Sequence, residues 1–231
     1  MAVTALIVFA VQTAAAKAGS LAAGCFDYSK PDPDNVFLFK TVHHIVQAAI
    51  ALVIIFIITK TKKVSFRLKP IKNSAGIKYT CIFTAVIFVY VVISYFVGTK
   101  TGSVVPYAFE LNRRNCLGDL MFQLLLSGPS EEILFRALPI TVLGMINKDG
   151  KKKEWAAILI SALLFGIAHI GWSINPFSIS FSWFQVVYAA VLGIAYGITY
   201  VKSESIIYPM IMHSMSNVIM DGVGFLVFSA V

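Results

Sequence analysis

Charged side chains are scarce in this sequence of 231 residues. Aspartate, glutamate, lysine and arginine make up 13% of the chain, whereas 58% of it is hydrophobic. A typical soluble domain carries about 25% charged residues. So much apolar surface cannot be buried in a water-soluble protein of this length, which excludes an ordinary soluble domain. We therefore expect residues 1–231 to form a single integral membrane domain of the all-α class.

Cysteine is also scarce, with three residues, and no C-x-x-C spacing is present. The sequence therefore gives no support to a zinc knuckle or a redox pair. Cys25 follows Leu-Ala-Ala-Gly, which faintly resembles a lipoprotein cleavage box, but the segment before it lacks the basic start that a signal peptide needs. We expect residues 2–23 to be a first membrane helix, with a cleaved signal as the alternative.

Two further patterns are missing. No internal repeat is visible between the two halves of the chain, which argues against a proton or ion transporter built from inverted repeats. The His-Glu-x-x-His spacing of familiar zinc proteases is also absent.

Acidic residues are outnumbered by basic residues, 11 to 19, and the formal net charge is +8. The basic residues lie between apolar segments, so we assign them to anionic lipid head groups and not to nucleic acid. Together with Lys202, the loops 60–78 and 147–153 hold twelve basic residues, against six at the other ends of the segments. The positive-inside rule predicts that these two loops face the cytoplasm, of a cell membrane if the protein is prokaryotic.

Seven apolar segments are long enough, or nearly so, to cross a membrane, which takes about 20 residues. We predict a polytopic bundle of about seven transmembrane helices, within a range of six to eight. The long run is divided at residues 171–176, because Asn-Pro disfavours a helix at the residue before proline. The linker 30–35 is predicted to be extended at the surface. The segments cover residues 2–23, 41–59, 79–99, 117–146, two within 155–201, and 205–230.

The most informative feature is a group of charges inside segment 117–146. Glu132 and Arg136 are four residues apart, so a helix places them on one face as an ion pair. Glu131 lies about 100° around the helix and stays outside that pair. Ionisable residues at membrane depth cost at least about 2.5 kcal/mol each. A functional site is therefore the expectation, and a structural ion pair between helices is the alternative.

Gly128 and Pro129 interrupt the same segment. At about 1.5 Å per residue the segment would extend about 45 Å, whereas the hydrocarbon core is about 30 Å thick. We expect a kink at this point, or a helix that ends and restarts with Gly128 as its N-cap. In the second case Glu131 would lie in the first turn, where free N–H groups stabilise a carboxylate.

Two histidines and an asparagine lie in later apolar segments. His169 follows Phe165 by four residues, and Asn217 follows His213 by four, so each pair shares one helical face. A lone histidine in a membrane is often a structural hydrogen-bonding residue. Two histidines, an amide and a carboxylate pair on three segments instead suit a base, an acid and oxyanion donors.

The adjacent His43 and His44 stand apart from this set. They lie at the start of segment 41–59, and adjacent residues point to different faces of a helix. We interpret this pair as interfacial and not as ligands of one metal ion.

Three pieces of the sequence, in order, resemble a known family. Glu-Glu-x-x-x-Arg, Phe-x-x-x-His and His-x-x-x-Asn are similar to the motifs of the CPBP family, which comprises type II CAAX prenyl endopeptidases, bacteriocin-processing proteins and Abi proteins. The resemblance implies a catalytic core over residues 116–225, with residues 1–115 as variable N-terminal spans. Family members often have Gly after the Arg, where this chain has Ala137.

The resemblance implies an intramembrane endopeptidase of the glutamate type. Glu131 would activate water together with His169, while His213 and Asn217 would stabilise the oxyanion. The supporting residues would be Glu132, Arg136 and Phe165. From the predicted spans, His213 lies about 9 Å nearer the cytoplasmic end than His169, a difference that helix tilt can absorb.

No cofactor is expected. Zinc held by Glu131, His169 and His213 is the alternative, since two imidazoles and a carboxylate can bind that ion. The implied substrate is a peptide or a prenylated protein at the lipid bilayer, with CAAX-type processing of prenylated C-termini as one form. A non-catalytic membrane scaffold or a bacteriocin-immunity protein of the same fold is the alternative function.

Overall fold

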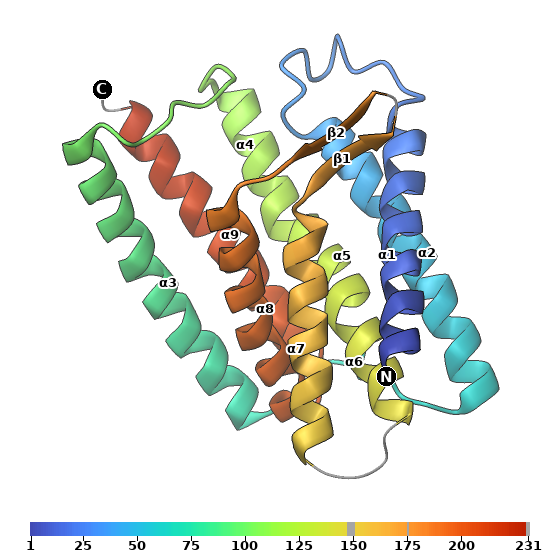
Figure 1. The fold of residues 1–231 in the computed structure, drawn as a ribbon. Coiled ribbons are helices and arrows are strands. Elements are labelled where there is room, and N and C mark those ends of the chain that lie inside the picture. Colours follow the sequence, from blue (N-terminus) through green and yellow to red (C-terminus); the bar gives the residue numbers. More distant parts are fainter. Residues whose placement is uncertain (147–150, 175, 230–231) are drawn as a thin grey trace.

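The computed structural model describes residues 1–146, 151–174 and 176–229. In this part of the chain seven helical rods run side by side, and a short β-hairpin lies at the upper end of the bundle in Figure 1. The loop after α2 and the start of α7 lie at the lower end. The rods are α1 (Ala2–Ala23), α2 (Leu38–Lys62), α3 (Ser74–Thr101), a composite rod from Arg113 to Ile146, α7 (Lys151–Ala168), α8 (Trp183–Ser203) and α9 (Ile207–Ser229).

Five of the described helices, α1, α2, α3, α8 and α9, are long and apolar enough to cross a membrane. Their outward faces expose large apolar side chains such as Phe56, Phe88 and Phe96. Exposure of such surface to water costs roughly 25 cal/mol per Å², whereas lipid tails cover it. The prediction of an all-α membrane helix bundle is therefore confirmed. The other two rods carry charge, because α7 begins with three lysines and a glutamate and the composite rod holds the acidic pair.

The predicted break within the run 155–201 is confirmed, and it takes the form of a hairpin. Strands β1 (Gly171–Ile174) and β2 (Phe177–Ser180) pair antiparallel between α7 and α8. Lys17 of α1 fixes the hairpin to the bundle. Its Nζ donates to the carbonyl oxygen of Trp172 at 3.3 Å and lies 3.9 Å from the centre of the indole ring.

The composite rod does not restart at Pro129. Gly128 has φ −55° and ψ −53°, and the helix continues through it. The expected restart is therefore wrong, and Glu131 lies within a continuous helix instead of at a free N-terminus. The rod consists of α4 (Arg113–Phe122), η1 (Gln123–Ser127), α5 (Gly128–Glu132), η2 (Ile133–Ala137) and α6 (Leu138–Ile146), where η1 and η2 are π-helical turns.

Two prolines account for the two wide turns. Pro129 follows η1, and Pro139 follows η2, each after one intervening residue. A proline lacks an N–H group, and its ring clashes with the carbonyl four residues earlier in a regular α-helix. A π-helical turn widens the helix at that point, and such turns occur frequently at functional sites. The chain therefore continues as a helix through both prolines.

The second wide turn binds two neighbouring helices. Pro139 cannot donate to the carbonyl of Phe135, and that oxygen instead accepts from the Ser161 hydroxyl of α7 and from Arg136 Nη1. The adjacent carbonyl of Leu134 accepts from Gln12 Nε2 of α1 at 3.0 Å. These bonds anchor α1 and α7 to the turn that follows the acidic pair and carries Arg136.

The loop between α1 and α2 differs from its prediction. Residues 30–35 form turns instead of an extended linker, and the Asp32 side chain is 1% exposed. Its carboxylate accepts from the backbone N–H groups of Val36, Phe37 and Leu38 at 2.9, 2.8 and 2.7 Å. Asp32 therefore caps the start of α2, where free N–H groups and the helix dipole favour a negative charge.

The capping bonds set the ionisation of this carboxylate. Burial raises the pKa of Asp32. The three N–H donors and the nearby charge of Arg114 lower it by more than burial raises it, so the pKa lies below the usual value. Because the pKa of Asp32 is lower in the folded state, its carboxylate stabilises the folded protein at pH values above the unfolded pKa of about 3.9. That contribution is lost as the pH falls through the folded pKa.

We predict that Asp32→Ala lowers the free energy of unfolding by about 1–2 kcal/mol at neutral pH. Thermal or denaturant unfolding of purified protein in detergent measures this change. The difference from wild type should shrink in acid, because the wild-type carboxylate then loses its charge. Asp27→Ala is the matched control, since Asp27 is an exposed residue of the same loop. An equal loss of stability in both variants would contradict the capping role.

Candidate functional site

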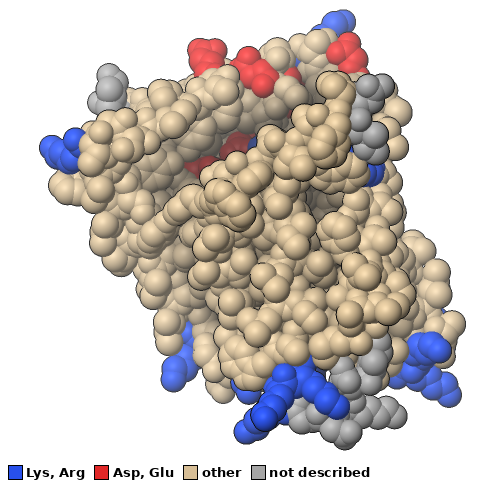
Figure 2. Space-filling model, viewed as in Figure 1, with Lys and Arg blue, Asp and Glu red and all other residues tan. Residues whose placement is uncertain are grey.

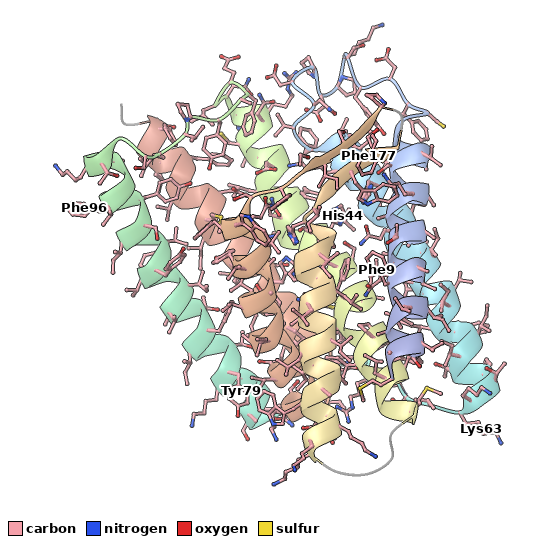
Figure 3. All side chains as sticks on the ribbon, viewed as in Figure 1. Phe9, His44, Lys63, Tyr79, Phe96 and Phe177 are labelled. Atoms are coloured by element: carbon pink, nitrogen blue, oxygen red, sulfur yellow. The ribbon has the colours of Figure 1, made fainter. Side chains whose placement is uncertain are left out.

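The candidate site lies where α2, the centre of the composite rod, the end of α7 and α9 meet. Figure 3 labels His44 in the upper half of the bundle, among the side chains between these rods. The acidic pair comes from α5, Arg136 from η2, His169 from just beyond α7, and His213 from α9.

The predicted ion pair between Glu132 and Arg136 is present. Arg136 Nε lies 3.2 Å from Glu132 Oε2, and both side chains are 0% exposed. The two atoms are in ion-pair contact without the alignment of a hydrogen bond. The guanidinium group lies 4.3 Å from the centre of the Phe165 ring and 5.4 Å from that of Tyr196. Cation–π contacts of this kind stabilise a desolvated cation by about 2 kcal/mol.

His213 completes this buried group. Its Nδ1 lies 2.9 Å from Glu132 Oε1. A carboxylate can only accept, so Nδ1 carries a proton and Nε2 is the nitrogen that faces away from Glu132. The ring stacks on Tyr196 at 5.2 Å, and Phe165 packs edge-on at 5.6 Å. Glu132 therefore binds Arg136 through one oxygen and orients His213 through the other.

Glu131 lies outside this pair, as the sequence predicts. Its side chain is 19% exposed, whereas that of Glu132 is fully buried. Its Oε2 lies 3.8 Å from His213 Nε2, and its Oε1 lies 3.7 Å from His44 Nε2. Both separations exceed the length of a hydrogen bond. The Glu131 carboxylate is thus flanked by two imidazoles without being bound directly to either.

His169 lies just beyond the end of α7. Its Nδ1 is 2.8 Å from the carbonyl oxygen of Phe165, which only accepts, so this nitrogen is a donor. The His169 ring packs edge-on against Phe165 at 4.9 Å. Among the described residues it makes no ion-pair contact with Glu131. Phe165 contacts both His169 and His213, so the expected depth difference between the two histidines does not separate them.

Asn217 lies one helical turn from His213, and its amide is already bonded. The Nδ2 group donates to Gln123 Oε1 at 2.9 Å and to Ser127 Oγ at 3.2 Å, both in η1. The first wide turn therefore holds Asn217 beside the site. Sequence reasoning identified Asn217 but not its two partners.

The interpretation of His44 as interfacial is wrong. His44 Nδ1 lies 2.7 Å from Ser130 Oγ, the ring packs edge-on against Phe122 at 5.0 Å, and Nε2 faces Glu131. A signal for this position was present in the sequence. His44 precedes Gln47 by three residues and Ala51 by seven, and the latter two are buried. That spacing places His44 on the inward face of α2.

A metal centre was the alternative prediction for part of this site. Over residues 1–146, 151–174 and 176–229, no group of three or more histidine, cysteine, aspartate or glutamate side chains is arranged to hold a metal ion. Of the predicted zinc set, Glu131 Oε2 lies 3.8 Å from His213 Nε2, and His169 contacts Phe165 through its Nδ1 and its ring.

The comparisons with known proteins agree with the motifs. Residues 113–219 match the family model described as "Type II CAAX prenyl endopeptidase Rce1-like". No curated protein and no solved structure matches the chain. The matched segment runs from the start of the composite rod to a point just beyond Asn217, and it leaves out α1, α2 and α3. Over residues 113–219 the chain is therefore similar to the Rce1-like family of type II CAAX prenyl endopeptidases, within the CPBP family.

Proposed function

We propose that this protein is an intramembrane endopeptidase in which Glu131 activates water for hydrolysis of a peptide bond. The observation that carries the proposal is the difference between two adjacent carboxylates. Glu132 is fully buried and bonded to Arg136 and His213, whereas Glu131 is partly accessible and lies outside the pair. A carboxylate that is free to accept a proton is the group that a general base requires.

The remaining roles follow from the chemistry of the neighbours. His169 shares the proton transfer with Glu131, and His213 with Asn217 stabilises the oxyanion of the tetrahedral intermediate. His213 can donate from Nε2 only when both ring nitrogens are protonated, because Nδ1–H is directed at Glu132. Asn217 donates to the oxyanion after releasing Gln123 or Ser127.

The substrate is a peptide segment within or beside the bilayer. No metal takes part in the proposed mechanism, and the other partner of the protein is lipid. The six motif groups gather into one region, which supports catalysis over a purely structural role for the fold.

The first test is cleavage by purified protein in detergent. Wild type should cleave a prenylated CAAX peptide or members of a mixed membrane-peptide library. Glu131→Gln should lose at least about 100-fold in kcat/KM, because general base catalysis contributes 10²–10⁴-fold in rate. Glu154→Gln is the matched control, since Glu154 is exposed in the first turn of α7.

Two outcomes would contradict this mechanism. One is equal cleavage by wild type and by Glu131→Gln. The other is loss of activity on treatment with a chelator, followed by recovery on addition of zinc. Loss of cleavage in the Glu154→Gln control would instead indicate a general effect of removing charge.

The different charges at the two ends of the bundle indicate which end faces the cytoplasm, and therefore from which side a substrate enters. Figure 2 shows lysines and arginines gathered at the lower end, with others at the upper end, where acidic side chains also lie at the surface and inside a hollow. We propose that the basic lower loops face the cytoplasm of a multi-pass protein in the cell membrane. The site lies nearer the upper end, because His44 is six residues into α2 and His169 directly follows the end of α7. Below it, α6 contributes Leu138, Ile140 and Leu143 to the apolar core.

This orientation separates two kinds of substrate. With the basic loops in the cytoplasm, a substrate reaches the site from the bilayer or from the outer face. Cleavage of prenylated C-termini, which are presented at the cytoplasmic face, requires the reverse orientation. The similarity of residues 113–219 to the Rce1-like family favours prenylated C-termini as substrates. The asymmetry of the basic residues instead favours substrates that arrive from the bilayer or the outer face.

Labelling of single cysteines decides between these orientations. An impermeant maleimide applied to bacterial spheroplasts should label Cys25, which is exposed in the upper loop, once the other two cysteines are replaced. A Ser65→Cys variant without the native cysteines should be labelled only after the membrane is permeabilised, since Ser65 is exposed in the lower loop. The opposite pattern would reverse the orientation and favour prenylated substrates.

A further inference from the structure

His44 contacts the proposed catalytic carboxylate from a part of the chain outside the family segment. It belongs to α2, whereas the family match begins at residue 113. Its Nε2 lies 3.7 Å from Glu131 Oε1, and its side chain is 13% exposed. None of the sequence motifs includes this residue, and the mechanism proposed above gives it no role.

The hydrogen bonds around His44 fix which nitrogen carries its proton. Ser130 has a single hydroxyl proton, and it donates that proton to the carbonyl of Ser127 at 3.1 Å. Ser130 Oγ therefore accepts from His44 Nδ1 at 2.7 Å. The Nδ1–H of His44 is committed to Ser130, and Nε2 is the nitrogen that faces Glu131.

His213 has the same arrangement on the other side of Glu131. Its Nδ1–H is committed to Glu132, and its Nε2 faces Glu131 Oε2 at 3.8 Å. Each oxygen of the Glu131 carboxylate thus has one imidazole Nε2 beside it. At these separations an imidazole acts on the carboxylate through its charge or through one shared water molecule. A single histidine would leave one of the two oxygens without such a neighbour.

We propose that His44 is a positioning residue for Glu131. Through Nε2 it holds the Oε1 side of the carboxylate, while His213 holds the Oε2 side, so that Glu131 keeps a fixed orientation toward water and substrate. This inference rests on the proposed function of Glu131. It also assigns part of the site to the N-terminal spans, which therefore supply more than a membrane anchor.

The neighbouring histidine is the matched control. His43 is on the same helix, its ring lies 5.2 Å from that of His44, and both of its nitrogens have partners elsewhere. Its Nδ1 is 3.2 Å from Ser20 Oγ, and its Nε2 is 3.0 Å from Gln47 Oε1. Replacement of His43 therefore removes an imidazole of α2 without removing a neighbour of Glu131.

Two substitutions of His44 by an amide side chain distinguish its contact with Glu131 from its bond to Ser130. The amide of asparagine overlays the Nδ1 side of an imidazole, so His44→Asn keeps the bond to Ser130 and loses the group at Glu131. The amide of glutamine overlays the Nε2 side, so His44→Gln keeps a polar group at Glu131 and loses the bond to Ser130. We expect His44→Asn to lower kcat by about 100-fold with little change in KM, because misplacement of a reacting group by about 1 Å costs about that much. His44→Gln should remain within about tenfold of wild type, and His43→Gln should match wild type.

The experiment measures kcat and KM for these variants, for wild type and for Glu131→Gln, with the prenylated CAAX peptide and the membrane-peptide library as substrates. Thermal unfolding of each variant in detergent checks that it is folded. If Glu131→Gln is inactive while His44→Asn is as active as wild type, the inference about His44 is overturned and the proposed function stands. Greater loss in His44→Gln than in His44→Asn overturns it also, because the bond to Ser130 would then be the important contact. Wild-type activity in Glu131→Gln, or no cleavage by wild type, overturns the proposed function and this inference with it.

Discussion

The buried contact between Glu132 and Arg136 is the interaction on which the site depends. Two opposite charges with no exposure to solvent are tolerated in a membrane only if they neutralise each other. The second oxygen of Glu132 binds His213, and the guanidinium group lies against Phe165 and Tyr196. Glu132 thus orients the imidazole of α9 and pairs with Arg136, while Glu131 stays outside the ion pair.

The two wide turns of the composite rod make this arrangement possible. The proline after each turn removes a backbone donor, and the carbonyls of the second turn bind side chains from α1 and α7 instead. The first turn provides Gln123 and Ser127 for Asn217. A regular helix directs its backbone carbonyls along its own axis. Here the departure from regularity links the composite rod to three other helices around the acidic pair.

Much of the fold follows from local features of the sequence. Long runs without charge predicted the helices, because a bilayer requires about 20 apolar residues in succession. Asn-Pro predicted the break before α8, and the spacing of four predicted the ion pair of Glu132 with Arg136. The restart at Gly128, one of two structures expected there, is wrong, because a membrane helix can either break at a proline or widen around it. Whether the chain breaks or widens depends on neighbouring helices that can bond the freed carbonyls, and local sequence does not specify those neighbours.

The misplaced residues have a common cause. His44 and Asp32 were assigned to the interface or the surface from their position near a segment end. In the structure both are turned inward, where Ser130 binds His44 and the backbone N–H groups at the entry to α2 bind Asp32. Those partners lie in a loop turn or on another helix, so hydrophobic periodicity alone does not reveal them. Polar residues near segment ends are therefore the positions where tertiary contacts decide the outcome.

The most direct measurement of the central claim is a double-mutant cycle on the buried pair. Free energies of unfolding in detergent would be compared for wild type, Glu132→Gln, Arg136→Met and the double variant. Each single change leaves one buried charge without its partner, which should cost about 3–5 kcal/mol. The double variant should cost at least about 2 kcal/mol less than the sum of the single changes. Additive effects would mean that the two charges do not stabilise each other, and would contradict the account of how Glu131 is left available for chemistry.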